Sequence, residues 1–218
     1  MKNRFTLLAS FLLLATLFSC VTQGFVGSGQ LVSEVRTVDS FTKITTVGAA
    51  KIVVNYGPTQ SLNIKADDNI LADIITEVDD NELTIKLRPG KSYSNIHLSV
   101  SITLPELTSI RNTGSGEFEV NGFENLSSLG FINTGSGKAT LTGSCVDFTI
   151  KNSGSGSVNG FDFVSETCTI ANTGSGRFEV NCTRQLVGAN SGSGSIFYKG
   201  NPAISFENNG SGKIQDAN

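Results

Sequence analysis

The 218-residue sequence has no Trp, one Met, one His and only 16% charged residues. Its 16 basic and 19 acidic residues include no basic run, which excludes the electrostatic footprint of a nucleic-acid-binding protein. It does have 24 Gly and 38% hydrophobic residues, too apolar for a disordered chain and too rich in turn formers for a helical one. We therefore expect an all-β protein.

The first twenty residues are typical of an export signal. Lys2 and Arg4 precede an apolar run at 5–18, which is short for a membrane span and is followed by no stop-transfer pattern. Leu17 and Ser19 stand at the lipobox positions before Cys20. We predict a signal peptide at 1–19, lipid attachment at Cys20 and a flexible tether through residue 30, with an ordinary cleavage site as the alternative.

Removal of residues 1–19 leaves 14 basic against 19 acidic residues, a net charge of −5. The expected product is an acidic exported protein, held by its N-terminal lipid at the outer membrane. It would face either the cell surface or the periplasm.

A repeated pentapeptide, Asn-x-Gly-Ser-Gly, is the most informative feature of the sequence. Its copies follow one another at intervals of 21, 19, 20, 18 and 18 residues. A nearly fixed period indicates structural units that stack on one another, as in solenoids. The copies begin at Asn112, Asn133, Asn152, Asn172, Asn190 and Asn208.

The residues around each copy alternate as in strands. The positions two and four before each Asn, and six and eight after it, are mostly apolar, whereas the positions between them are mostly polar. Each unit therefore reads as a strand, a corner and a second strand, paired with the next unit. We predict a parallel, right-handed β-helix or two-sheeted β-solenoid.

The corner residues have structural roles in this prediction. The Asn side chains would form a hydrogen-bonded ladder, and the glycines would permit positive φ where the chain reverses. A calcium-binding roll needs an Asp at every turn, which the corners lack. An ice-binding hydroxyl lattice is also disfavoured, because the outward column after each corner mixes Glu, Lys, Ser and Arg. The corner glycines are Gly114, Gly116, Gly135, Gly137, Gly154, Gly156, Gly174, Gly176, Gly192, Gly194, Gly210 and Gly212.

Residues 31–105 lack the pentapeptide but alternate strongly, so we expect irregular N-terminal rungs and a cap. Residues 47–50 resemble an early corner, and we expect one helical turn at 69–73 before a strand at 74–78. The region joins six regular repeats at 106–218 to make one domain over 31–218. Asp216 would place a charge at the edge of the last strand, which discourages pairing with another chain.

Little in the sequence points to catalysis. His97 alternates with apolar neighbours and is expected to face solvent, and Cys168 occupies an apolar column. Cys145 and Cys182 lie two repeats apart, too far for a disulfide, whereas pairing of Cys168 with Cys182 stays open. Two intervening repeats separate Glu117 and Glu119 from Glu179, so these acids do not form the pair of carboxylates that a glycoside hydrolase needs. We predict no catalytic residues, no metal and no cofactor, and leave the ligand-binding residues unassigned.

Five features together resemble the family called putative auto-transporter adhesin, head GIN domain. They are the lipoprotein-type leader, residues 66–69 (Ala-Asp-Asp-Asn), residues 83–87 (Leu-Thr-Ile-Lys-Leu), residues 102–105 (Ile-Thr-Leu-Pro) and the Asn-x-Gly-Ser-Gly corners. The resemblance covers nearly all of 31–218. It implies a cell-envelope β-helix similar to pectin-lyase-like proteins, without catalytic residues and with a role in adhesion.

From this we expect a surface that binds a glycan or a host or envelope protein, or that assembles into a homo-oligomer. The Ser and Thr columns beside Glu119, Asn159, Glu179 and Gln215 would supply its polar groups. The alternatives are a polysaccharide-active enzyme and a periplasm-facing scaffold for a partner protein.

Overall fold

A computed structural model describes residues 24–218 of the chain. The predicted signal peptide and Cys20 lie outside these residues. No helix in the described part is long and apolar enough to span a bilayer.

The prediction of an all-β protein is confirmed, since residues 24–218 contain strands and one 3₁₀ turn, η1 (Leu71–Asp73). This turn and the strand that follows it lie where the sequence predicts them. The N-terminal strands are β1 (Gly24–Val26), β2 (Leu31–Val35), β3 (Lys43–Val47), β4 (Lys51–Tyr56), β5 (Ser61–Asp67), β6 (Ile74–Asp79), β7 (Glu82–Leu87), β8 (Ser92–Ser94) and β9 (Leu98–Leu104).

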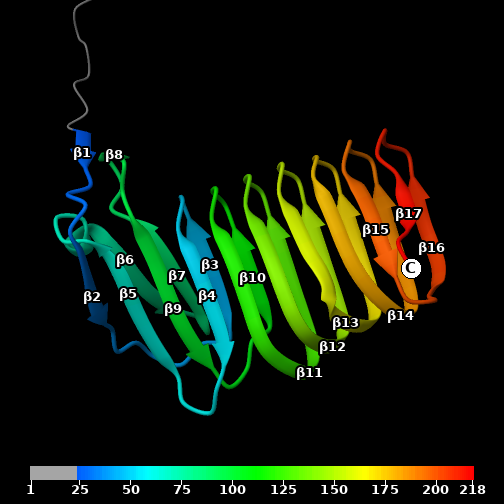
Figure 1. Ribbon diagram of the computed structural model, residues 1–218, viewed down its shortest axis with the longest axis horizontal. Coiled ribbons are helices and arrows are strands. Elements are labelled where there is room, and N and C mark those ends of the chain that lie inside the picture. The colour runs from blue at the N-terminus through cyan, green and yellow to red at the C-terminus, as the bar shows by residue number, and fades with distance from the viewer. Residues whose placement is uncertain (1–23) are drawn as a thin grey trace, which may run out of the picture.

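The repeated half consists of parallel strands stacked from one repeat to the next (Figure 1). Each long strand starts after one corner, bends once and ends at the next pentapeptide Asn, so that equivalent residues of successive repeats pair. The strands are β10 (Ser109–Asn112), β11 (Glu117–Asn133), β12 (Lys138–Asn152), β13 (Ser157–Asn172), β14 (Arg177–Asn190), β15 (Ser195–Lys199), β16 (Ala203–Asn208) and β17 (Ile214–Asp216).

The bend in each long strand creates two layers. The pre-corner layer, which leads into each corner, pairs β10 with the second halves of the long strands and with β16. The post-corner layer pairs β4 with their first halves and with β15 and β17.

The predicted inward columns form the core between these layers. Phe118 packs edge-on against Phe131, and Phe148 against Phe163, with ring centroids 6.3 and 5.2 Å apart. All four rings are fully buried. The last repeat differs from the prediction, because Ile204 in β16 is 49% exposed where no further repeat covers it.

The structure forms the early corner that residues 47–50 indicate. β3 and β4 pair in parallel with β10 and β11, and the Ser115 amide donates to the Gly48 carbonyl (3.0 Å). Beyond this corner the strand pattern changes, since β6 pairs with β7, and β5 with β9 and β2, in antiparallel fashion. The N-terminal region thus adds antiparallel pairs to the stack, of which β6–β7 is a hairpin.

The flexible tether predicted for residues 20–30 is wrong for its described part. β1 pairs in parallel with β8, and the Gly29 amide donates to the carboxylate of Asp67 (2.8 Å). Residues 24–30 therefore lie against the domain. The polar groups of this segment, whose composition predicted a linker, instead form hydrogen bonds with the domain.

Candidate functional site

The pentapeptide Asn side chains form a ladder along the corners, which is buried except at its last member, Asn208. Asn112 Nδ2 donates to Asn133 Oδ1 (2.8 Å), and the same contact recurs at 2.7–2.8 Å up to Asn208. At the N-terminal end the Thr46 hydroxyl donates to Asn112 Oδ1 (3.1 Å). Each amide also donates to a corner carbonyl, so these side chains are engaged in structural hydrogen bonds.

The corner glycines are required for a reason other than the predicted one. Among the twelve, only Gly176 has positive φ (134°). A Cβ at Gly135 would lie under 3.0 Å from the Gly114 carbonyl of the preceding repeat, and one at Gly154 would lie as close to Gly135. Close stacking of successive corners thus excludes side chains at these positions.

The outer surface of the post-corner layer bears an aromatic and basic patch, made of Phe161, Arg177, Glu179, Phe197 and Lys199. The two rings are half-buried on β13 and β15. The Arg177 guanidinium lies 3.6 Å from the centroid of Phe197, and Lys199 Nζ lies 4.7 Å from that of Phe161. Glu179 accepts from Arg177 Nε (2.7 Å).

Sequence reasoning missed this patch, although two Phe residues in otherwise polar columns are a signal that could have found it. The outward acids that the sequence analysis singled out each face a cation. Glu119 pairs with Lys51 (2.8 Å), and Glu117 lies 4.0 Å from Lys138. Each of these two acids therefore belongs to an ion pair on the outer face of the sheet.

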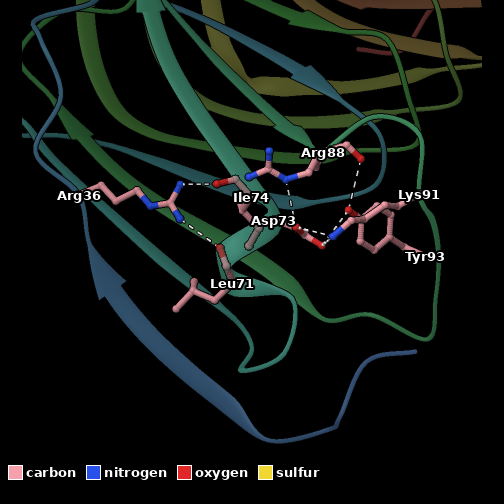
Figure 2. A network of polar contacts seen from close by, with 7 residues as sticks. All are labelled: Arg36, Leu71, Asp73, Ile74, Arg88, Lys91 and Tyr93. Atoms are coloured by element: carbon pink, nitrogen blue, oxygen red, sulfur yellow. Dashed lines mark hydrogen bonds and ion pairs between the residues drawn. The ribbon is translucent and has the colours of Figure 1, made fainter. Parts of the chain in front are cut away.

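A polar cluster centred on Asp73 joins η1 to the segment before β8 (Figure 2). The nearly buried Asp73 carboxylate accepts from Lys91 Nζ (2.6 Å), Arg88 Nε (3.2 Å) and the Tyr93 hydroxyl (3.1 Å). The Lys91 hydrogen bond does most to hold the pKa of Asp73 below its ordinary 3.8, with help from Tyr93 and Arg88. Burial opposes this shift.

A second part of the cluster is centred on Arg36, whose guanidinium donates to the carbonyls of Ile74 (2.6 Å) and Leu71 (3.2 Å). The Asp73 part in turn contacts the N-terminal strand. Lys91 Nζ lies 4.3 Å from the Phe25 ring centroid, and Tyr93 packs against the same ring at 5.9 Å.

Asp67 holds the chain that follows β1. Its carboxylate has no exposed surface and accepts from the backbone amides of His97 (2.6 Å) and Gly29 (2.8 Å). The His97 amide is the main cause of the lowered pKa of Asp67. Asn69 continues the contact, with Nδ2 donating to the Val26 carbonyl (2.8 Å). We call Asp67, Asn69, Asp73, Lys91 and Tyr93 the N-terminal clamp.

His97 lies on the surface, as its alternation predicts, with 64% of its side chain exposed. Its Nδ1 lies 3.3 Å from Asp67 Oδ1, a partner that the sequence did not reveal. The signal was available in part, because Asp67 ends an alternating strand within the 66–69 motif.

The open question of a Cys168–Cys182 disulfide is answered by free, buried thiols at Cys145, Cys168 and Cys182. Burial raises the pKa of Cys145 to about 12 and that of Cys168 well above its ordinary 9.0. Within residues 24–218, no group of three His, Cys, Asp or Glu side chains is placed to hold a metal ion.

Residues 40–202 match the family described as putative auto-transporter adhesin, head GIN domain. No curated protein matches the chain.

Several solved structures share the fold. A putative adhesin from Bacteroides fragilis NCTC 9343 is 25% identical, with a TM-score of 0.75 over 89% of this chain and 100% of that one. A putative lipid binding protein from Parabacteroides distasonis ATCC 8503 is 22% identical, with a TM-score of 0.53 over 88% of this chain and 100% of that one. A putative adhesin from Parabacteroides merdae ATCC 43184 is 18% identical, with a TM-score of 0.52 over 90% and 100%. The latter two likenesses concern the fold alone.

Proposed function

This chain belongs to the putative auto-transporter adhesin, head GIN domain family, and from that premise we propose that it is an adhesive binding protein of the bacterial cell envelope. One observation carries the proposal: family membership over residues 40–202 coincides with a fold shared with the B. fragilis putative adhesin. The stacked repeats would present their outer layers to a glycan or to a protein of another cell or of the envelope.

The proposed architecture is a right-handed parallel β-solenoid with an N-terminal cap. Its support is the register, in which equivalent residues of successive repeats pair and the Asn ladder runs through the corners. Such a stack gives a long outer surface on a rigid scaffold, which suits binding of an extended partner.

The proposed anchor is a lipid on Cys20, and the clamp supports a role for this end of the molecule as the membrane-proximal one. Gly24 begins β1 and follows Cys20 by four residues, which span at most about 14 Å when fully extended. A lipid on Cys20 would therefore keep the clamp close to the membrane. The regular repeats would project away from it.

Binding fits the outer surface better than the alternative of a polysaccharide-active enzyme. Glycoside hydrolysis uses two carboxyl groups across the scissile bond, whereas Glu117, Glu119 and Glu179 each face a basic side chain. This distribution favours recognition by charge and shape.

The anchor is tested by growing cells expressing the full chain with an alkyne-bearing fatty acid and measuring its incorporation. Cys20→Ala should abolish labelling and release the protein from the membrane fraction, whereas Cys145→Ala, which alters a buried thiol, should leave both unchanged. Labelling that survives in Cys20→Ala would refute the anchor.

Adhesion is tested by comparing a deletion strain with strains complemented by the wild-type or Cys20→Ala chain. The wild-type chain should restore attachment to host cells or glycan-coated surfaces, and the released variant should not.

Protease treatment of intact and permeabilised cells then gives the orientation. Protection until permeabilisation, with a periplasmic control intact and the purified chain shown to be cleavable, would replace adhesion with the periplasmic scaffold.

A further inference from the structure

The aromatic and basic patch has the composition of a binding site in an acidic protein. Arg177, Lys199 and the neighbouring Lys213 supply three cations near the two rings, and Glu179 pairs with Arg177, although the chain as a whole carries a net charge of −3. Lys213 lies next to the patch, because its amide donates to Ser195 Oγ and Ser195 pairs with Arg177. These cations lie on or next to β14, β15 and β17, at the C-terminal end of the post-corner layer.

The two cations beside the rings are held in place but keep free hydrogen-bonding capacity. Arg177 stacks on Phe197 and gives Nε to Glu179, while its terminal Nη groups donate no hydrogen bond within residues 24–218. Lys199 Nζ has no carboxylate within 4.0 Å in the described chain. Because the guanidinium is already held against an aromatic ring, it loses little further side-chain entropy when it binds an anion through two parallel hydrogen bonds.

The rings add apolar contact area at fixed positions. Phe161 and Phe197 stand two strands apart, roughly 10 Å across the sheet, so a ligand that touches both must be longer than one sugar ring. Asn181 of the intervening strand β14 donates from Nδ2 to the Phe161 carbonyl (3.1 Å), and Asn159 of β13 stands in register with Glu179 and Phe197.

We infer that this patch binds an acidic polysaccharide, an inference that rests on the proposed function and specifies its ligand. The apolar C–H face of a sugar would pack on the two rings, and its hydroxyl groups would meet Asn159 and Asn181. Carboxylate or sulfate groups would bind Arg177, Lys199 and Lys213. The patch thus offers a matching partner to the apolar, hydroxyl and anionic groups of an acidic polysaccharide.

The test uses the purified full chain in detergent with three probes: dextran, dextran sulfate and polygalacturonate. Because dextran and dextran sulfate share a backbone, their difference isolates the charge. The wild-type chain should bind at least one acidic probe in preference to dextran, and binding should weaken as salt screens the charges. Equal binding of dextran and dextran sulfate, or no binding of either acidic probe, would overturn the inference.

Matched double variants locate the site. Arg177→Gln with Lys199→Gln should weaken acidic-probe binding by about tenfold or more. Arg111→Gln with Lys151→Gln makes the same charge change on exposed residues of the pre-corner layer and should leave binding near the wild-type value. Equal losses in both would show non-specific attraction and reject the patch.

Phe197→Leu separates ring stacking from charge, since it keeps an apolar side chain and all the cations. It should weaken binding with an unchanged melting temperature, whereas unchanged binding would remove the rings from the site. In the cell assay, attachment that needs the chain but survives the Arg177/Lys199 double variant would leave the proposed function standing and refute this site. Failure of attachment for the wild-type chain would refute the proposed function itself.

Discussion

Residues 106–218 repeat one set of contacts at every turn of the chain, whereas residues 24–105 use most of theirs once. In the repeated half an Asn, a pair of corner glycines and four apolar positions recur, and each copy is supported by its neighbours (Figure 1). In the N-terminal half single side chains such as Asp67 and Asp73 hold segments next to β1 and β8 through contacts that occur once.

This difference predicts different responses to damage. A defect in one repeat should propagate through the stack, because each corner before the last is packed between two others. A defect in the clamp should stay local to residues 24–30 and the loops that hold them.

The largest effect should come from Gly154→Ala in a central corner. The added Cβ would lie under 3.0 Å from the backbone of Gly135, which cannot move without shifting its own neighbours. We expect a loss of about 3 kcal/mol in the free energy of unfolding, measured by urea denaturation. Gly24→Ala is the control, since no atom lies within 4 Å of its added Cβ. Similar stability of the two variants would contradict close corner packing.

Asn152→Ala should have the next largest effect. It removes the acceptor of Asn133 Nδ2 and the donor to Asn172 Oδ1, and leaves these buried groups without their ladder partner. The expected cost is about 2 kcal/mol. Asn208→Ala removes the same side chain at the exposed end of the ladder and should cost clearly less. Equal costs would mean that the ladder adds little beyond its corner contacts.

Acid should loosen the clamp before it affects the ladder. The pKa values of Asp67 and Asp73 lie below 3.8 in the folded chain, so their stabilising contribution is present above pH 3.8 and is lost as the pH falls through the folded values. Amide side chains of the ladder do not titrate there. Hydrogen exchange at pH 6 and pH 3, corrected for intrinsic rates, should show selective loss of protection at residues 24–30.

Asp67→Asn is the matched variant for this measurement. It keeps the shape of the side chain but removes the carboxylate that accepts from Gly29 and His97. Protection at residues 24–30 should already be low at pH 6 and should change less on acidification. A pH response as large as that of the wild-type chain would assign the loosening to other groups.

The same contrast explains how far the sequence could predict the structure. The strands, their inward columns and the stacking of the corners follow from a short repeat, because equivalent residues pair with one another. The reason for the glycines did not follow, since the distance between Gly135 and Gly114 depends on how closely the repeats stack.

The candidate site and the clamp depend on contacts that no local pattern encodes. Residues 24–30 read as a linker, because their partners lie 38–43 positions away at Asp67, Asp68 and Asn69. Phe161 and Phe197 likewise meet their cations only through the register of three different strands. Repetition makes the recurring contacts predictable, whereas contacts that occur once stay hidden in both halves.

The smallest expected effect is on the thiols, which report opening of the repeated half. With pKa values of about 12 at Cys145 and well above 9.0 at Cys168, almost no thiolate is present at pH 8, and alkylation in the folded chain should be very slow. Mass spectrometry after iodoacetamide treatment should find both unlabelled until urea is added. Gly154→Ala should speed this labelling, because it disturbs the stack that buries them. Asp67→Asn should leave it unchanged, since the clamp touches neither thiol; faster labelling in that variant would show that the two halves open together.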